Sequence, residues 1–144
     1  MEKVIEFIKR ETLITQGDDI TAGISGGADS VYLLRVLCRL REKMDIRIQA
    51  VHVNHQIRRE AAADQKFVED LCRKLHVPCS VVSVDVPARA REEKLSLEEA
   101  GRKVRYEAFY RAVKGKKNGK IAVAHHQNDQ AETFLFRVAR GTGL

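Results

Sequence analysis

Six consecutive residues near the start of the chain have the types needed to hold a phosphate group. They are Ser25, Gly26, Gly27, Ala28, Asp29 and Ser30. The two glycines allow a sharp turn and a close approach of the backbone to a ligand, because no Cβ is in the way. Successive backbone N–H groups in such a turn bind anions, and serine hydroxyls add donors. The segment predicts an anion site, although a plain capped turn between a strand and a helix is the alternative.

Two familiar phosphate-binding loops do not fit this segment. A Walker A loop needs a lysine to reach the terminal phosphates, and the segment has none. The dinucleotide fingerprint Gly-x-Gly-x-x-Gly is also missing. The segment instead resembles the PP-loop of the ATP pyrophosphatases, which hold the departing pyrophosphate while AMP is passed to the substrate.

A second segment has carboxylates spaced to bind a cation. Residues 125–133 follow an expected strand, and a helix is predicted from Asp129 to Arg140. Asp129 and Glu132 would share a face of its first turn. Their oxygens suit Mg²⁺ or an ammonium group, although Asp-x-x-Glu at a helix start is also a capping box. His125 and the histidine after it lack a third spaced ligand, which argues against zinc.

Two further polar segments accompany these. Residues 51–59 change abruptly from apolar to polar at the end of an expected strand, and they include His52. On an expected helix, Arg102 and Arg105 are three residues apart and could pair with phosphate oxygens. A solvated loop and an ordinary charged helix surface are the alternatives for these two segments.

The elements that must position these residues alternate between helix and strand. Strands are expected at residues 20–24, 46–53, 79–84 and 120–124. Helices are expected at residues 1–16, from near Asp29, and at 58–76, 96–114 and 129–140, with a connector without periodicity at 87–94. This alternation predicts an α/β fold, a doubly wound parallel sheet with helices on both faces. Three of the four segments follow strands, so they should converge at the carboxyl edge of the sheet, where such folds bind ligands.

Composition narrows the class of protein. The 144 residues carry a net charge of +6, with −1 in residues 1–72 and +7 in residues 73–144. A basic half suggests a polyanionic partner such as nucleic acid. The three cysteines include no CxxC pair, so we expect free thiols and a cytoplasmic protein. No apolar run is long enough for a membrane span.

Together the four segments resemble the tRNA(Ile)-lysidine synthetase family over residues 20–144. The resemblance implies the PP-loop fold, also called adenine nucleotide alpha hydrolase-like, and a chemistry that needs ATP and Mg²⁺. The wobble cytidine of tRNA(Ile) would attack the α-phosphate of ATP, releasing pyrophosphate. Free L-lysine would then displace AMP. A homodimer is compatible with this resemblance.

The resemblance also implies roles for individual residues. The segment from Ser25 to Ser30 would hold the ATP phosphates, and Arg105 would approach the α-phosphate. Asp129 and Glu132 would serve Mg²⁺ or the lysine ammonium, with His125 nearby. Asn128 stands where relatives often carry Asp, which should leave that work to Asp129.

Residues 1–144 are expected to be a truncated PP-loop ATP-binding catalytic domain, without the C-terminal portion that binds tRNA. A PP-loop tRNA thiolase is an alternative function, but it would be expected to use cysteines, often in a CxxC pair. A non-catalytic ATP-binding module is the other alternative, although such a module has no need for a carboxylate pair.

Overall fold

A central sheet of five strands organises the molecule. In the computed structural model of the chain, residues 1–56, 61–126 and 134–140 are described, with only the backbone given for residues 125, 126 and 134–140. The strand order is β3-β2-β1-β4-β5. The strands are β1 Asp19–Gly23, β2 Arg47–Asn54, β3 Cys79–Ser83, β4 Gly119–His126 and β5 Phe134–Arg140. The first four are parallel, as predicted, and β5 pairs antiparallel with β4.

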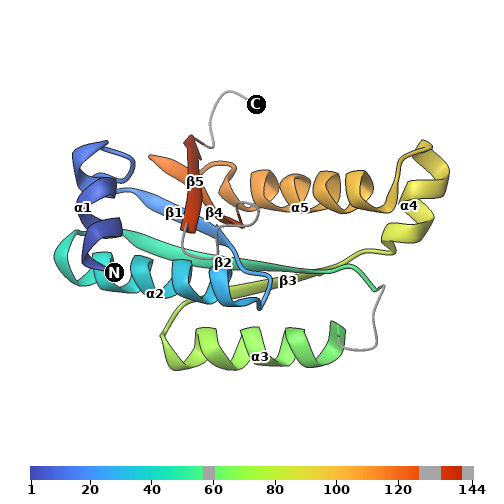
Figure 1. Ribbon diagram of the computed structural model, residues 1–144, viewed down its shortest axis with the longest axis horizontal. Coiled ribbons are helices and arrows are strands. Elements are labelled where there is room, and N and C mark those ends of the chain that lie inside the picture. Colours follow the sequence, from blue (N-terminus) through green and yellow to red (C-terminus); the bar gives the residue numbers. More distant parts are fainter. Residues whose placement is uncertain (57–60, 127–133, 141–144) are drawn as a thin grey trace.

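Helices cover both faces of this sheet, as expected for a doubly wound fold (Figure 1). The helices α2 (Ala28–Lys43) and α3 (Ala61–Lys74) lie on one face, and α5 (Leu97–Val113) lies on the other. The short helix α1 (Glu2–Arg10) packs beside α2, and α4 (Val86–Glu93) precedes α5. The largest apolar core lies under α1, α2 and α3, and a second core lies under α5.

The prediction of a helix from Asp129 to Arg140 is wrong for its described part. Residues Phe134–Arg140 form β5, whose register runs from Lys120 opposite Arg140 to His126 opposite Phe134. The sequence Phe-Leu-Phe-Arg-Val is rich in aromatic and branched side chains, which suit a strand as well as a helix. The free edge of β4 supplies hydrogen-bond partners, and this tertiary pairing decides in favour of the strand.

Two other expected elements differ from the structure. Residues 87–94 were expected to lack regular structure, but Val86–Glu93 is the helix α4. Asp85 accepts a hydrogen bond from the N–H of Ala88 at 3.0 Å, and Pro87 lies in the first turn, where its missing N–H costs nothing. The opening helix ends at Arg10 instead of residue 16, because the chain turns at Thr12, which has a φ of 54°.

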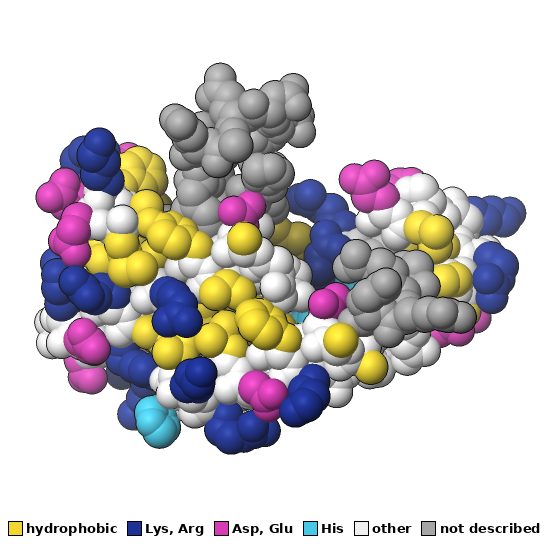
Figure 2. Space-filling view, turned by 60° about the horizontal axis from the view of Figure 1, so that its bottom comes forward, with side chains coloured by type: hydrophobic (Ala, Val, Ile, Leu, Met, Phe, Trp, Pro, Cys, Tyr) yellow, Lys and Arg dark blue, Asp and Glu magenta, His cyan; other side chains and the backbone are white. Residues whose placement is uncertain are grey.

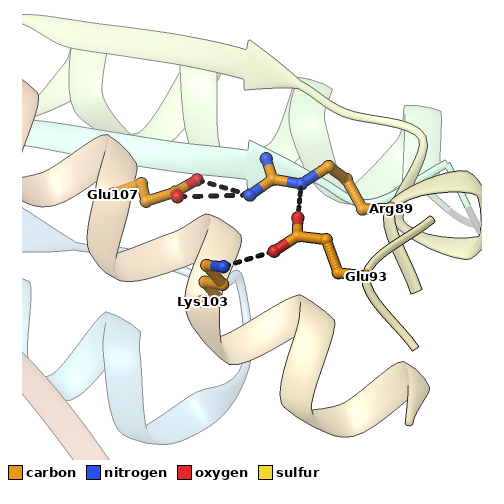
Figure 3. A network of polar contacts seen from close by, with 4 residues as sticks. All are labelled: Arg89, Glu93, Lys103 and Glu107. Atoms are coloured by element: carbon orange, nitrogen blue, oxygen red, sulfur yellow. Dashed lines mark hydrogen bonds and ion pairs between the residues drawn. The ribbon is translucent and has the colours of Figure 1, made fainter. Parts of the chain in front are cut away.

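The helices α4 and α5 are held together by a network of four charged side chains (Figure 3). Arg89 donates to both carboxylate oxygens of Glu107 at 3.1 and 3.2 Å. Glu93 accepts from both Arg89 and Lys103. The predicted capping box at Ser96 and Glu99 is present and begins α5. These contacts fix the position of the helix that carries Arg102 and Arg105.

In the part of the chain that the structure describes, no helix is long and apolar enough to cross a membrane. The three cysteines are free thiols, as expected. Figure 2 shows the face formed by α2 and α3, where Lys and Arg side chains are scattered among Asp and Glu. Net charge alone therefore does not mark a binding surface on this face.

Candidate functional site

A cleft of about 540 Å³ lies at the carboxyl ends of β1, β2 and β4. Its lining brings together three of the four segments singled out in the sequence. These contribute Ser25 and Ser30, His52 and His55, and Arg102 and Arg105. The expected convergence is therefore confirmed for the two segments that follow β1 and β2, whereas residues 127–133 of the third lie outside the described residues. A cleft of this size suits a small-molecule ligand.

The loop after β1 turns where the glycines allow it. Gly26 has a φ of 101°, which an L side chain rarely adopts. Its N–H donates to the hydroxyl of Ser30 at 3.0 Å, and the N–H of Gly27 donates to the hydroxyl of Ser25 at 3.2 Å. The hydroxyl of Ser30 in turn donates to the carbonyl of Gly27 at 2.9 Å. The two serines thus hold the glycine turn in shape.

The start of α2 has the properties of an anion site. Its N-cap residue is Gly27, and no side chain caps it. The N–H of Val31 bonds to the carbonyl of Gly27 at 3.1 Å. The amides of residues 28–30 therefore precede the helix ladder and carry the positive end of the helix dipole. Gly27 and Ala28 are exposed. These observations favour the anion site over the capped turn.

Arg105 places a half-buried cation in the same cleft. Burial lowers the pKa of its guanidinium, and Arg102 acts in the same direction, while Tyr106 and Glu98 oppose the shift. None of the ion pairs among the described residues involves Arg105, although the charge of Glu98 attracts it. A partly desolvated cation is stabilised by an anion that supplies the missing hydrogen bonds. Arg105 therefore favours a phosphate or carboxylate ligand in the cleft.

Arg102 and Tyr106 form a second part of the lining. The guanidinium of Arg102 lies 5.3 Å from the centroid of the Tyr106 ring, a cation–π contact. The hydroxyl of Tyr106 is buried and has no hydrogen-bond partner among the described residues. Buried hydroxyls are normally bonded, so the Tyr106 oxygen is an exception among the described side chains.

Three of the expected site residues are not placed by the structure. Asp129 and Glu132 lie outside the described residues, and for His125 only the backbone is given, in β4. Within the described ranges, no group of three or more His, Cys, Asp or Glu side chains could hold a metal ion. The expected metal site therefore stays a prediction.

Sequence reasoning missed Asp64, which reaches the cleft from α3. Its Cβ would lie 3.9 Å from a β-carbon built on Gly26, so Asp64 borders the glycine loop after β1. The signal was available, because Asp64 is four residues before the buried Val68 and so shares the inward face of its helix. By contrast, none of the three cysteines lines the cleft.

Comparison with known proteins agrees with this geometry. Residues 1–144 match the family described as PP-loop domain. The chain belongs to this family. Among curated proteins, the chain is similar to a tRNA(Ile)-lysidine synthase of Clostridioides difficile, with 49% identity over 144 residues. Another, from Petrotoga mobilis, is 41% identical over 143 residues.

The chain spans only part of these relatives. The alignments cover 99% of this chain but 31% of the Clostridioides protein and 46% of the Petrotoga protein. Among solved structures, this PP-loop domain is similar to an NH3-dependent NAD synthetase from Campylobacter jejuni. That match has a TM-score of 0.62 at 21% identity and covers 83% of this chain and 52% of the other. It shows the fold alone.

Proposed function

We propose that residues 1–144 are the ATP-binding catalytic domain of a tRNA(Ile)-lysidine synthase. The protein would ligate lysine to the wobble cytidine of tRNA(Ile), with conversion of ATP to AMP and pyrophosphate. The names of the relatives support this assignment, and so does a cleft that combines a phosphate loop with a cation. Arg105 is the observation that carries it, because a half-buried arginine at this place favours an anionic ligand.

In the proposed first step, the cytidine oxygen bonds to the α-phosphorus of ATP and the bond to pyrophosphate breaks. Charge then develops on the pyrophosphate oxygens. The loop at Gly26 and Gly27 and the positive end of α2 would stabilise this charge, and Arg105 would bind the α-phosphate oxygens. These donors are held on rigid elements, which lowers the cost of reorganisation during the step.

In the proposed second step, the lysine amine forms a bond to the activated ring carbon and AMP leaves with its oxygen. Asp129 and Glu132 would orient the amine or hold Mg²⁺. When bound, Mg²⁺ would neutralise part of the negative charge of the phosphates. His125 would lie near these groups. The roles of these three residues are part of the proposal and are carried by the family resemblance.

The same proposal implies a nucleic-acid partner, a cellular compartment and an oligomeric state. A further portion of the protein would recognise tRNA(Ile), so residues 1–144 would bind ATP yet modify tRNA poorly. The protein would work in the cytoplasm, where its tRNA substrate is. A homodimer also stays part of the proposal, and the mass of the protein in solution tests it.

The test uses the domain within a full-length synthase, incubated with ATP, Mg²⁺, lysine and tRNA(Ile), with each component omitted in turn. Mass analysis of the nucleosides should find lysidine only in the complete mixture. Arg105→Ala should lower turnover by about 10²–10³-fold, as expected for loss of one charge-stabilising donor. Arg111→Ala, at an exposed position of the same helix, is the matched control. Thiolated nucleosides formed with a sulfur donor, or no tRNA-dependent pyrophosphate release, would contradict the proposal.

A further inference from the structure

His52 makes a hydrogen bond that the proposed chemistry does not yet use. The side chain is only 3% exposed, at the carboxyl end of β2. Its Nδ1 lies 2.8 Å from the carbonyl oxygen of Ile24. A carbonyl oxygen can only accept, so Nδ1 must carry the proton and donate. The imidazole is thereby fixed in orientation beneath the chain that leaves β1.

The hydrogen bond from His52 takes the place of a backbone hydrogen bond to the carbonyl of Ile24, which the sheet does not supply. The register between β1 and β2 ends with Gly23 opposite Val51. Ile24 lies just beyond this pair, and its N–H still reaches the carbonyl of Val51 at 3.0 Å. Ile24 is 2% exposed, so its carbonyl also needs a partner. The side chain of His52 supplies that donor and allows the strand to end abruptly.

The next residue along the chain is Ser25, the first of the phosphate loop. The peptide unit between Ile24 and Ser25 is planar and trans, so the direction of the Ile24 carbonyl also fixes the direction of the Ser25 N–H. Ser25 then accepts from the N–H of Gly27 at 3.2 Å and donates to Ser30 at 3.2 Å. A shift at Ile24 would therefore be passed to the hydrogen bonds that hold the loop in shape.

We propose that His52 is a positioning residue of the phosphate loop, acting through the carbonyl of Ile24. The inference rests on the proposed function in one respect, that the phosphate chain of ATP is what the loop binds. His52 also lines the cleft, so direct contact between its Nε2 and the ligand is the competing explanation. Two substitutions separate these explanations, because Asn places an N–H near Nδ1 and Gln places one near Nε2.

The test measures dissociation constants of MgATP, pyrophosphate and adenosine for residues 1–144 by calorimetry. His52→Phe should weaken MgATP and pyrophosphate about tenfold or more and leave adenosine within about twofold. His52→Asn should restore most of the loss, and His52→Gln should not. The exposed His76, changed to Asn, is the control. Circular dichroism checks folding, and if His52→Phe does not fold, the comparison of Asn with Gln decides.

Three outcomes would overturn the proposal. These are unchanged binding in a folded His52→Phe, an equal loss for adenosine, and recovery by Gln but not by Asn. Failure of the unaltered chain to bind MgATP would instead count against the proposed function. The two failures are therefore distinguishable.

Discussion

The ring of Phe109 lies against Gly23, so closely that a β-carbon at residue 23 would fall 2.4 Å from its Cζ atom. Gly23 ends β1 and Phe109 is on α5, so this contact sets how near α5 comes to the edge that bears the cleft. We expect Gly23→Ala to destabilise the fold by about 1–3 kcal/mol, because overpacking a core displaces its neighbours. Urea unfolding measures this change.

A compensating substitution sharpens that prediction. Phe109→Leu removes the atoms that a β-carbon would meet. The double variant should therefore lose less free energy of unfolding than the two single variants lose in sum. Wild-type stability in Gly23→Ala would mean that this contact does not constrain α5.

Gly26 and Gly115 form a matched pair for testing the loop. Their φ angles are +101° and +83°, and only Gly26 belongs to the loop at the cleft. Alanine at either position should cost about 1–2 kcal/mol of backbone strain. Only Gly26→Ala should also weaken ATP binding, by about tenfold or more. Thermal unfolding and calorimetry measure the two effects, and equal ATP affinity in both variants would exclude the loop as the phosphate site.

A buried ion pair lies at the amino ends of β1 and β4, away from the cleft, and it should affect stability but not ligand binding. Lys120 Nζ lies 2.7 Å from Asp18, whose side chain is 3% exposed. Lys120→Met should cost about 3–5 kcal/mol, because it leaves a buried carboxylate without its cation. Replacing Asp18 by Asn in the same chain should recover part of this loss. ATP affinity should not change in the folded variants, since these residues precede β1 and begin β4.

The network between α4 and α5 should weaken in acid. Hydrogen bonds from Lys103 and from Arg89 lower the pKa of Glu93 below its ordinary value of 4.5. A carboxylate with a lowered folded-state pKa contributes stability above the unfolded value and loses it as the pH falls through the folded value. Wild type should therefore unfold at a higher temperature than Glu93→Gln at pH 7, with the gap closing below about pH 4.5. A gap that stays constant across this range would contradict the prediction.

Local patterns were enough to predict most of the fold. Glycines at the end of a buried apolar strand, followed by the stripe of Val31, Leu34 and Leu37, predicted the loop and α2 correctly. Ser96 and Glu99 predicted the start of α5, since a capping box depends on neighbours in sequence. Parallel strands then bring their carboxyl ends together, which is why the cleft could be expected from the order of the segments.

The missed strand and the missed contact of His52 arose where distant residues decide the conformation, whereas α4 was missed despite its local cap at Asp85. The strand β5 exists because the edge of β4 pairs with it, and no local pattern in Phe134–Arg140 reveals that edge. The helix α4 has little amphipathic periodicity, and its charged side chains are used for contacts with α5. The link between His52 and Ile24 joins residues 28 positions apart, so a sequence alone does not predict it.

The serine hydroxyls of the loop limit how tightly a bare anion can bind. Because the amides of Gly26 and Gly27 are already matched by Ser30 and Ser25, an incoming phosphate would exchange one acceptor for another. The net gain in binding free energy is then the difference between a hydrogen bond to an oxyanion and one to a hydroxyl, and this difference is modest. Inorganic phosphate should therefore be a weak competitor, and selectivity would come from the rest of the nucleotide and the guanidinium opposite.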